Sequence, residues 1–202
     1  MMKLEINSIG YYENHAEAFV ERTSKADLTA LYQPFLRRLP EGAHILDVGC
    51  GSGRDAAAFL KLGYKVTATD PSKAMVEASS RLTGQPTLKL AFWDLKFERE
   101  FDGIWACASL LHVPKVEMNL VLHRLTRALK PGGCIYLSFK HGQGERVEHG
   151  RLFNDYTEDS FRPVLALQTS LTIERIWVSH DQRPGRVEKW LNIVARRTTA
   201  AI

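Results

Sequence analysis

Hydrophobic and polar positions follow two different repeats along this chain, and each repeat predicts its own kind of element. Between residues 13 and 39, apolar side chains recur at about the helical spacing of 3.6, which predicts helices, and Pro34 is placed to kink the second one. From residue 43 onward, short apolar runs typical of buried strands alternate with segments that have one apolar helical face. We expect strands at 43–48, 64–69, 87–92, 101–108 and 134–139, and helices at 53–62, 72–82, 114–129 and 157–167.

This alternation predicts a doubly wound α/β fold. Strands separated by helices of ten or so residues form a parallel sheet that is covered by helices on both faces. The β-rich runs 171–178 and 188–196 are joined by a loop too short for a crossover helix. They are therefore expected to pair as an antiparallel hairpin at the end of the sheet.

Composition supports one folded domain. Of the 202 residues, 45% are hydrophobic and 25% are charged, which is enough apolar material for a packed core. Lys and Arg exceed Asp and Glu by 27 to 23, and this surplus is scattered until the C-terminal third, unlike the basic stripe of a dedicated nucleic-acid binder. The opening segment lacks the apolar stretch of a signal peptide, and no run is long enough to span a membrane, so a cytoplasmic location is expected.

The three cysteines predict neither a disulfide framework nor a metal site. Cys50, Cys107 and Cys134 lie in apolar segments without C-x-x-C spacing. We interpret them as reduced, small core residues, and we expect no metal.

A glycine-rich loop directly follows the first strand. It reads Asp47-Val48-Gly49-Cys50-Gly51-Ser52-Gly53, and a helical pattern begins at its end. Glycines allow a tight turn with bare backbone, and a helix N-terminus attracts anionic or hydroxyl-rich ligands, although an ordinary strand-to-helix turn has the same composition. The spacing G-x-G-x-G after an acidic residue differs from the dinucleotide fingerprint G-x-G-x-x-G, which favours an adenosyl compound without a pyrophosphate.

Asp70 ends the second predicted strand, 17 residues after Gly53. A carboxylate at this place can accept hydrogen bonds from both ribose hydroxyls. The string Asp70-Pro71-Ser72 is also a typical helix start, and the two roles are compatible.

Taken together, these motifs resemble the class I S-adenosylmethionine-dependent methyltransferases, and most of all the small bacterial proteins of the tellurite-resistance type. The resemblance rests on ILDVGCGSGRDA, TDPS, Asp94, FDGIWACASLLHV and LKPGG, in order, and it covers about residues 11–140. It implies a Rossmann-like sheet of seven strands in the order 3-2-1-4-5-7-6, with strand 7 antiparallel. It also implies S-adenosyl-L-methionine as cofactor and S-adenosyl-L-homocysteine as product.

The resemblance also implies residue roles. Gly49, Gly51 and Gly53 would lie under the methionyl part of the cofactor, Asp47 near its ammonium group, and Asp70 at the ribose. The other residues that it places at the cofactor are Asp94 at the adenine amino group, Leu95 with its backbone, Met75 and Trp93 beside the ring, Ser109 at the methionyl group and Tyr12 as a lid. For Met75 and Trp93 individually, plain packing in the core is the favoured interpretation.

Two predicted loops place positive charge at the edge of the sheet where parallel strands end. One loop carries Lys140, His141 and Arg146, and the other carries His180, Arg183 and Arg186. Guanidinium groups bind oxyanions in a bidentate manner, so we predict a small polar or anionic acceptor that Arg183 and Arg186 bind. His180 is the candidate base or positioning group. The alternative is a solvated turn in which Asp181 pairs with an arginine.

Glycines at 142, 144 and 150 suggest a mobile lid over 140–155, and His112 is interpreted as a helix-start or core histidine. The whole is expected to be one domain, with a helical cap at 1–40, a cofactor-binding core at 41–140, and a substrate-side lid with the C-terminal hairpin at 141–202.

Three functions are compatible with this sequence. The first is methylation of a small acceptor. Methylation of RNA or protein is disfavoured, because no binding domain and no interleaving of aromatic and basic residues is visible. A non-catalytic cofactor-binding sensor or activating subunit would not need the charged loops. The identity of the acceptor and the oligomeric state leave no mark in the sequence.

Overall fold

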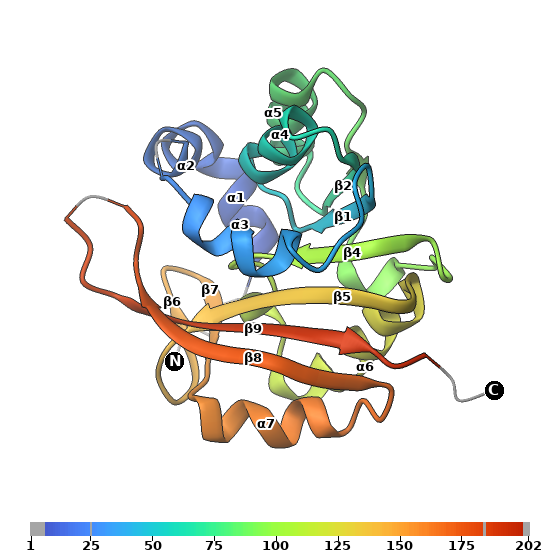
Figure 1. Ribbon diagram of the computed structural model, residues 1–202. Helices are drawn as coiled ribbons and strands as arrows, with labels where there is room; N and C mark the ends of the chain where they lie inside the picture. Colours follow the sequence, from blue (N-terminus) through green and yellow to red (C-terminus); the bar gives the residue numbers. More distant parts are fainter. Residues whose placement is uncertain (1–6, 25, 184, 200–202) are drawn as a thin grey trace.

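A seven-stranded sheet forms the centre of the protein (Figure 1). The computed structural model describes residues 7–24, 26–183 and 185–199. The strand order is β3-β2-β1-β4-β5-β9-β8. The strands are β1 (His44–Val48), β2 (Lys65–Asp70), β3 (Leu88–Lys89), β4 (Phe101–Ala106), β5 (Leu129–Lys140), β8 (Leu171–His180) and β9 (Lys189–Arg197).

The first five strands pair in parallel, and β9 runs antiparallel to both β5 and β8. Counted within this sheet, β8 is the sixth strand and β9 the seventh, so the predicted order 3-2-1-4-5-7-6 and the C-terminal hairpin are confirmed.

Helices cover both faces of the sheet because side chains alternate along each strand. On one face, α3 (Thr29–Leu36) and α4 (Arg54–Lys61) pack on Trp105 and Tyr136, whose rings stack with centroids 3.8 Å apart. The other face has α6 (Lys115–Ala128) and α7 (Glu158–Ala166) over Ile104 and Leu137. The helix α5 (Lys73–Thr83) connects β2 to β3.

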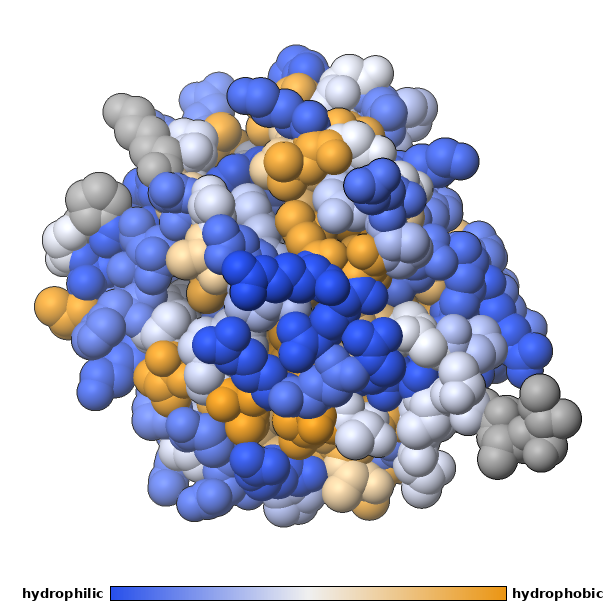
Figure 2. All heavy atoms as spheres, in the orientation of Figure 1, coloured by the Kyte–Doolittle hydropathy of each residue, from blue (hydrophilic) through white to orange (hydrophobic). Residues whose placement is uncertain are grey.

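The front of the molecule, over β8 and β9, is mainly hydrophilic (Figure 2). Glu174 of β8 forms ion pairs with Arg38 and Arg196.

Two further short helices, α1 (Ser8–Asn14) and α2 (Ala16–Thr23), precede α3 in the chain. The sequence predicted helices only from residue 13, so the start was wrong. The helix begins earlier because the Asn7 side chain accepts a hydrogen bond from Gly10 N at 2.7 Å and caps α1.

The segment predicted as a lid loop is a β-hairpin. Strands β6 (Gly144–Glu148) and β7 (Arg151–Asp155) pair in antiparallel fashion, and His149 and Gly150, both with positive φ, form the turn between them. The predicted loop therefore contains two paired strands, and its mobility as a lid stays a prediction. Phe153 and Leu152 of β7 are buried, which ties this hairpin to the rest of the fold.

Two further boundaries differ from the prediction. The third strand is only two residues long, since Phe92–Asp94 forms a 3₁₀ turn (η1) that buries Phe92 beside the glycine loop. The fifth strand begins at Leu129 rather than 134, because Leu129 already pairs with Phe101 of β4. Within the described residues, no helix is long and apolar enough to cross a membrane.

Candidate active site

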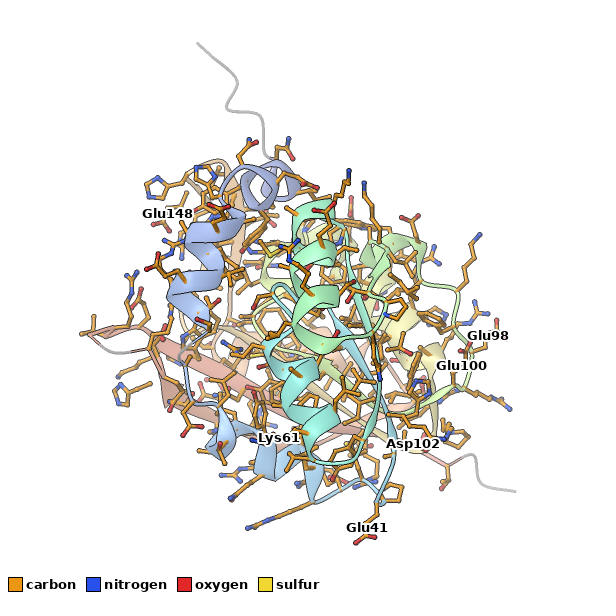
Figure 3. All side chains as sticks on the ribbon, turned by 90° about the horizontal axis from the view of Figure 1, so that it is seen from above. Glu41, Lys61, Glu98, Glu100, Asp102 and Glu148 are labelled. Atoms are coloured by element: carbon orange, nitrogen blue, oxygen red, sulfur yellow. The ribbon has the colours of Figure 1, made fainter. Side chains whose placement is uncertain are left out.

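One cavity of about 730 Å³ lies where β1, β2, β4 and β5 end. Helices α1 and α2 lie over one side of it, and the β6–β7 hairpin and the loop after β8 form the other side. Glu148 of the hairpin lies beside these N-terminal helices, whereas the acidic residues Glu98, Glu100 and Asp102 lie on the opposite side of the molecule (Figure 3). The cavity opens at the edge of a parallel sheet where ligands bind in folds of this kind.

The glycine loop forms the floor of this cavity with bare backbone. Gly49 and Gly51 have φ of 68° and 56°, in the left-handed region that side chains disfavour. A Cβ atom on Gly49 would lie 2.6 Å from Cβ of Ser109, so no other residue fits there without displacing Ser109. Gly53 caps α4 but does not line the cavity.

Asp47 is a buried carboxyl at the end of β1 without a complete set of partners. Its side chain lines the cavity, is 2% exposed, and its Oδ2 has no hydrogen-bond partner. Burial raises the pKa of Asp47 well above its usual value, and the nearby Asp55 acts in the same direction. Ser109 Oγ is also buried and unpartnered on this wall. Buried polar atoms of this kind indicate that a donor from a ligand is expected here.

Asp70 joins the glycine loop to the start of α5. Its carboxylate accepts hydrogen bonds from Gly51 N at 3.0 Å and Ser72 N at 2.9 Å, and it lines the cavity. Burial raises its pKa to about 6, although the two backbone hydrogen bonds act against this shift. Ser72 caps α5, so the helix-start interpretation of the Asp70-Pro71-Ser72 string is confirmed, and the ribose role of Asp70 stays a prediction.

The residues predicted around the adenine ring separate into two groups. Met75 and Trp93 line the cavity together with Phe92, and Met75 is almost fully buried. Asp94 is exposed and Leu95 is buried in the core, and neither lines the cavity.

Tyr12 of α1 reaches the cavity and contacts His112, which sequence reasoning had set aside. The Tyr12 hydroxyl lies 2.8 Å from His112 Nε2, and His112 Nδ1 lies 2.6 Å from the carbonyl oxygen of Leu152. A carbonyl can only accept, so Nδ1 carries the proton and Nε2 accepts from Tyr12. His112 lies in the 3₁₀ turn η2 (Leu110–His112), close to the predicted helix start, but it also lines the cavity.

The loop after β8 contains the ion pair that the sequence left open as an alternative. Arg183 donates through Nε at 2.9 Å and Nη2 at 2.5 Å to the Asp181 carboxylate, which also accepts from Trp190 Nε1 at 3.1 Å. Although burial acts in the opposite direction, these donors lower the pKa of Asp181 to about 2. The carboxylate paired with Arg186 is Glu188, at 3.7 Å. Both arginines and the exposed His180 line the cavity.

The other predicted loop is divided. Lys140 lines the cavity, but His141 and Arg146 do not; Arg146 forms ion pairs with Glu148 at 3.0 Å and Asp155 at 3.2 Å.

A buried network under the cavity was missed by sequence reasoning. Asp55 accepts hydrogen bonds from Tyr32 and Trp105, each at 2.8 Å, and from Arg54. Although burial opposes it, the Arg54 guanidinium lowers the pKa of Asp55. The available signal was the position of Arg54-Asp55 directly after the glycine loop. Cys50 and Cys107 also line the cavity, Cys134 is buried, and all three are free.

The sheet order, the glycine loop and the acidic residues at the ends of β1 and β2 define a Rossmann-like fold of the class I methyltransferases. Comparison with known proteins agrees with this class. Residues 45–133 match the family described as "Methyltransferase domain". Through this domain and its fold, the chain is similar to the class I S-adenosylmethionine-dependent methyltransferases.

Relatives in sequence are methyltransferases of larger size. The chain is 31% identical over 141 residues to the O-methyltransferase resE of Aspergillus sclerotiorum, which covers 64% of this chain and 52% of that protein. It is 34% identical over 105 residues to the ubiquinone biosynthesis O-methyltransferase of Xanthomonas oryzae pv. oryzae, covering 48% and 43% respectively. The chain spans about half the length of these relatives.

Solved structures share the fold over nearly the whole chain. The 1,6-didemethyltoxoflavin-N1-methyltransferase of Burkholderia thailandensis, with 1,6-didemethyltoxoflavin and S-adenosylhomocysteine bound, has a TM-score of 0.77 at 24% identity and covers 94% of this chain and 85% of its own. A TehB-like methyltransferase of Corynebacterium glutamicum has a TM-score of 0.72 at 22% identity, covering 94% and 99%. The [4+2]-cyclase SpnF also has the fold, with a TM-score of 0.75 at 15% identity and coverage of 97% and 98%. At these identities the likeness shows the fold alone.

Proposed function

We propose that this protein transfers a methyl group from S-adenosylmethionine to a small polar or anionic acceptor. The observation that carries the proposal is the buried Asp47 carboxyl, whose Oδ2 lacks a hydrogen-bond partner on a cavity wall next to the glycine loop. An ammonium group is the donor that such a carboxylate requires, and the methionyl end of the cofactor supplies one. Relatives named as methyltransferases support the same activity.

The residues present fit this cofactor. Gly49 and Gly51 leave room for the methionyl chain, Asp70 has lone pairs left for the ribose hydroxyls, and Met75 and Trp93 offer apolar contact for the adenine ring. Tyr12 and Ser109 also line this cavity. Three predicted cofactor residues do not line the cavity, namely Gly53, Asp94 and Leu95. We propose that they contact the cofactor through backbone atoms or from the rim of the cavity.

The bound cofactor would supply an electrophilic methyl group on a sulfonium. The protein's own residues would exclude water, hold the acceptor in line with that methyl group, and accept or stabilise charge on the acceptor. We propose His180, Arg183 and Arg186, with Lys140 and Arg146, as the substrate-side group. Because Arg183 is held by Asp181 and Arg146 by two carboxylates, these two arginines would shape the site rather than bind the acceptor directly.

We further propose that residues 1–202 act as one unit, with the cap at 1–40, the core at 41–140 and the substrate side at 141–202. Helix α1 joins the first and third of these parts, since Asn7 N donates to Gly150 O at 3.0 Å and Leu152 N donates to Ser8 Oγ at 3.2 Å.

A test of the proposal begins with ligand binding. Calorimetry with S-adenosylhomocysteine and with a nicotinamide dinucleotide is expected to show binding of the first alone. Asp47→Asn keeps the shape of the side chain but removes its ability to ionise against the ammonium group of the ligand, so it is expected to lower the affinity for S-adenosylhomocysteine by about 10- to 100-fold, as for a hydrogen bond to a charged group. Asp102→Asn, which alters an acidic residue outside the cavity, is the matched control. Unchanged binding in Asp47→Asn would refute the role of this carboxyl.

Transfer of the methyl group is then followed with labelled cofactor in a fractionated cell extract. Label in small metabolites is expected. Label in RNA or protein alone would favour a macromolecular acceptor, and cofactor binding without any transfer would favour a sensor or an activating subunit. The cyclase with the same fold makes this second step necessary, since fold by itself does not establish methyl transfer.

A further inference from the structure

The cationic side chains that line the cavity differ in whether a carboxylate forms an ion pair with them. Arg183 and Arg186 each have a carboxylate partner, Asp181 and Glu188. Lys140 and Arg151 line the same cavity, yet within the described residues neither has a carboxylate within 4.0 Å. The Nε of Arg151 is buried and has no hydrogen-bond partner there.

Lys140 and Arg151 both lie over the ring of Phe153, as does Arg146, whose Cζ is 4.7 Å from the ring centre. Lys140 Nζ lies 4.8 Å and Arg151 Cζ 4.9 Å from the centre of the Phe153 ring. Arg151 Cζ also lies 4.0 Å from the centre of the Tyr11 ring, so the guanidinium is held between α1 and β7. Lys140 comes from the end of β5 and Arg151 from the start of β7, and both line the cavity.

The carboxylates of the hairpin do not neutralise this pair. Glu148 lies opposite Arg151 in the hairpin register, but its carboxylate pairs with Arg146 at 3.0 Å and faces His149 at 3.9 Å. Asp155 also pairs with Arg146, and Lys140 acts on the Asp155 carboxylate only from beyond ion-pair distance. His112 experiences the resulting field: burial lowers its pKa to about 4, and the charges of Arg151 and Lys140 act in the same direction. Two cations of this kind, partly withdrawn from water, require an anion.

We propose that Lys140 and Arg151 form an oxyanion subsite that binds a carboxylate of the methyl acceptor. The planar guanidinium of Arg151 offers a two-pronged donor to a carboxylate, and Lys140 adds a point charge. The adjoining rings of Phe153 and Tyr11 suit the organic part of such an acid rather than a bare inorganic anion. The subsite deepens the proposed function and rests on it, because it assigns the acceptor of that reaction to the small organic acids.

The experiment uses benzoate as the probe and benzamide as its uncharged counterpart, at about pH 7, where benzoate is ionised. Each is titrated calorimetrically into the full chain with and without S-adenosylhomocysteine, and inorganic phosphate is titrated in parallel. Wild type is expected to bind benzoate at least about tenfold more tightly than benzamide, and more tightly than phosphate. Lys140→Met and Arg151→Met are each expected to weaken benzoate binding by about 10- to 100-fold and to leave benzamide unchanged.

Three variants make the result specific. Lys189→Met removes an exposed lysine on neighbouring β9 outside the cavity and is expected to match wild type. Arg151→Lys keeps the charge and is expected to retain part of the affinity that Arg151→Met loses, which a variant that merely failed to fold would not explain. Arg186→Met tests the rival location in the loop after β8.

The proposal is overturned if benzoate binds no better than benzamide, if only Arg186→Met weakens it, or if phosphate binds as tightly, which would indicate a site for inorganic oxyanions. Failure of the proposed function has a different signature, since wild type would then either not bind S-adenosylhomocysteine or bind it without transferring the labelled methyl group, whereas the benzoate titration still reports on the subsite.

Discussion

The hydroxyl of Tyr12 lies 2.8 Å from Nε2 of His112, although the two residues are 100 positions apart in the sequence. One comes from α1 and the other from the turn after β4, so this hydrogen bond attaches the N-terminal cap to the core. The ring of Tyr12 also packs edge-on against Phe19 of α2 with centroids 5.0 Å apart. Burial raises the pKa of Tyr12, offset in part by the neighbouring Arg151, so the hydroxyl stays protonated and remains a donor.

Replacement of Tyr12 by Phe tests this attachment. The variant leaves His112 Nε2 without its donor in a partly buried place, which is expected to lower the free energy of unfolding by about 1–3 kcal/mol. Tyr11→Phe is the matched control, because the Tyr11 ring contacts Arg151 but its hydroxyl has no hydrogen bond within the described residues. Chemical denaturation of both variants measures the difference; equal losses would show that the Tyr12 hydroxyl does not attach the cap.

The buried His112 also predicts a dependence of stability on pH. Its pKa is about 4 in the folded chain against 6.5 for the free side chain, mainly because of burial. Between these values the unfolded chain binds a proton that the folded chain does not, so stability falls as pH falls through this window. The shift corresponds to up to about 3 kcal/mol between pH 6.5 and pH 4.

His112→Gln has the same kind of donor and acceptor atoms but does not titrate, so it isolates this contribution. The stability advantage of wild type over the variant is expected to shrink as the pH is lowered from about 7 to about 4. Denaturation curves across this range measure it. A difference that stays constant with pH would mean that His112 has the same proton affinity in both states.

The sheet was predictable because its signals are local. Each of the runs at 43–48, 64–69 and 101–108 has apolar or β-branched residues at most of its positions, and each ends in or near a residue that the cavity uses. The glycine loop was predictable for the same reason, since positive φ at Gly49 and Gly51 depends on the residue itself.

Features that depend on distant partners were not predictable. The β6–β7 hairpin lacks apolar alternation in β6, and it is held by burial of Leu152 and Phe153 in the assembled fold. The pairing of Arg183 with Asp181, rather than with a ligand, follows from the path of the loop after β8. Similarly, Asp94 was placed at the cavity by resemblance, but the short β3 and the turn after it leave its side chain exposed.

Glu13 provides a second attachment of α1, and it predicts an effect on ligand release. Its carboxylate accepts hydrogen bonds from Lys73 N at 2.5 Å and Ala74 N at 3.1 Å, at the N-terminus of α5. Glu13→Gln weakens this contact and is expected to speed dissociation of S-adenosylhomocysteine about fivefold, equivalent to about 1 kcal/mol, because α1 lies over the cavity. Stopped-flow measurement of release tests this. Glu17→Gln on α2 is the control, and the idea fails if both variants release the ligand at the wild-type rate.

Two glycines with the same backbone conformation separate the effect of torsion from that of space. Gly49 and Gly84 both have φ of 68°, but a Cβ atom on Gly84 would meet nothing within 4 Å, whereas on Gly49 it would lie 2.6 Å from Cβ of Ser109.

Gly84→Ala is therefore expected to cost about 1–2 kcal/mol in stability, the price of a side chain in the left-handed region. Gly49→Ala is expected to cost about 1–3 kcal/mol more because of the added overlap, and to abolish binding of S-adenosylhomocysteine. The double variant Gly49→Ala with Ser109→Gly removes the atom of closest overlap, although the Phe92 ring stays 3.2 Å away, and should recover most of the additional loss of stability but not ligand binding, since the new methyl group still occupies the cavity floor. Denaturation and calorimetry on the three variants give both quantities, and similar stability losses for Gly49→Ala and Gly84→Ala would show that backbone torsion alone requires glycine at position 49.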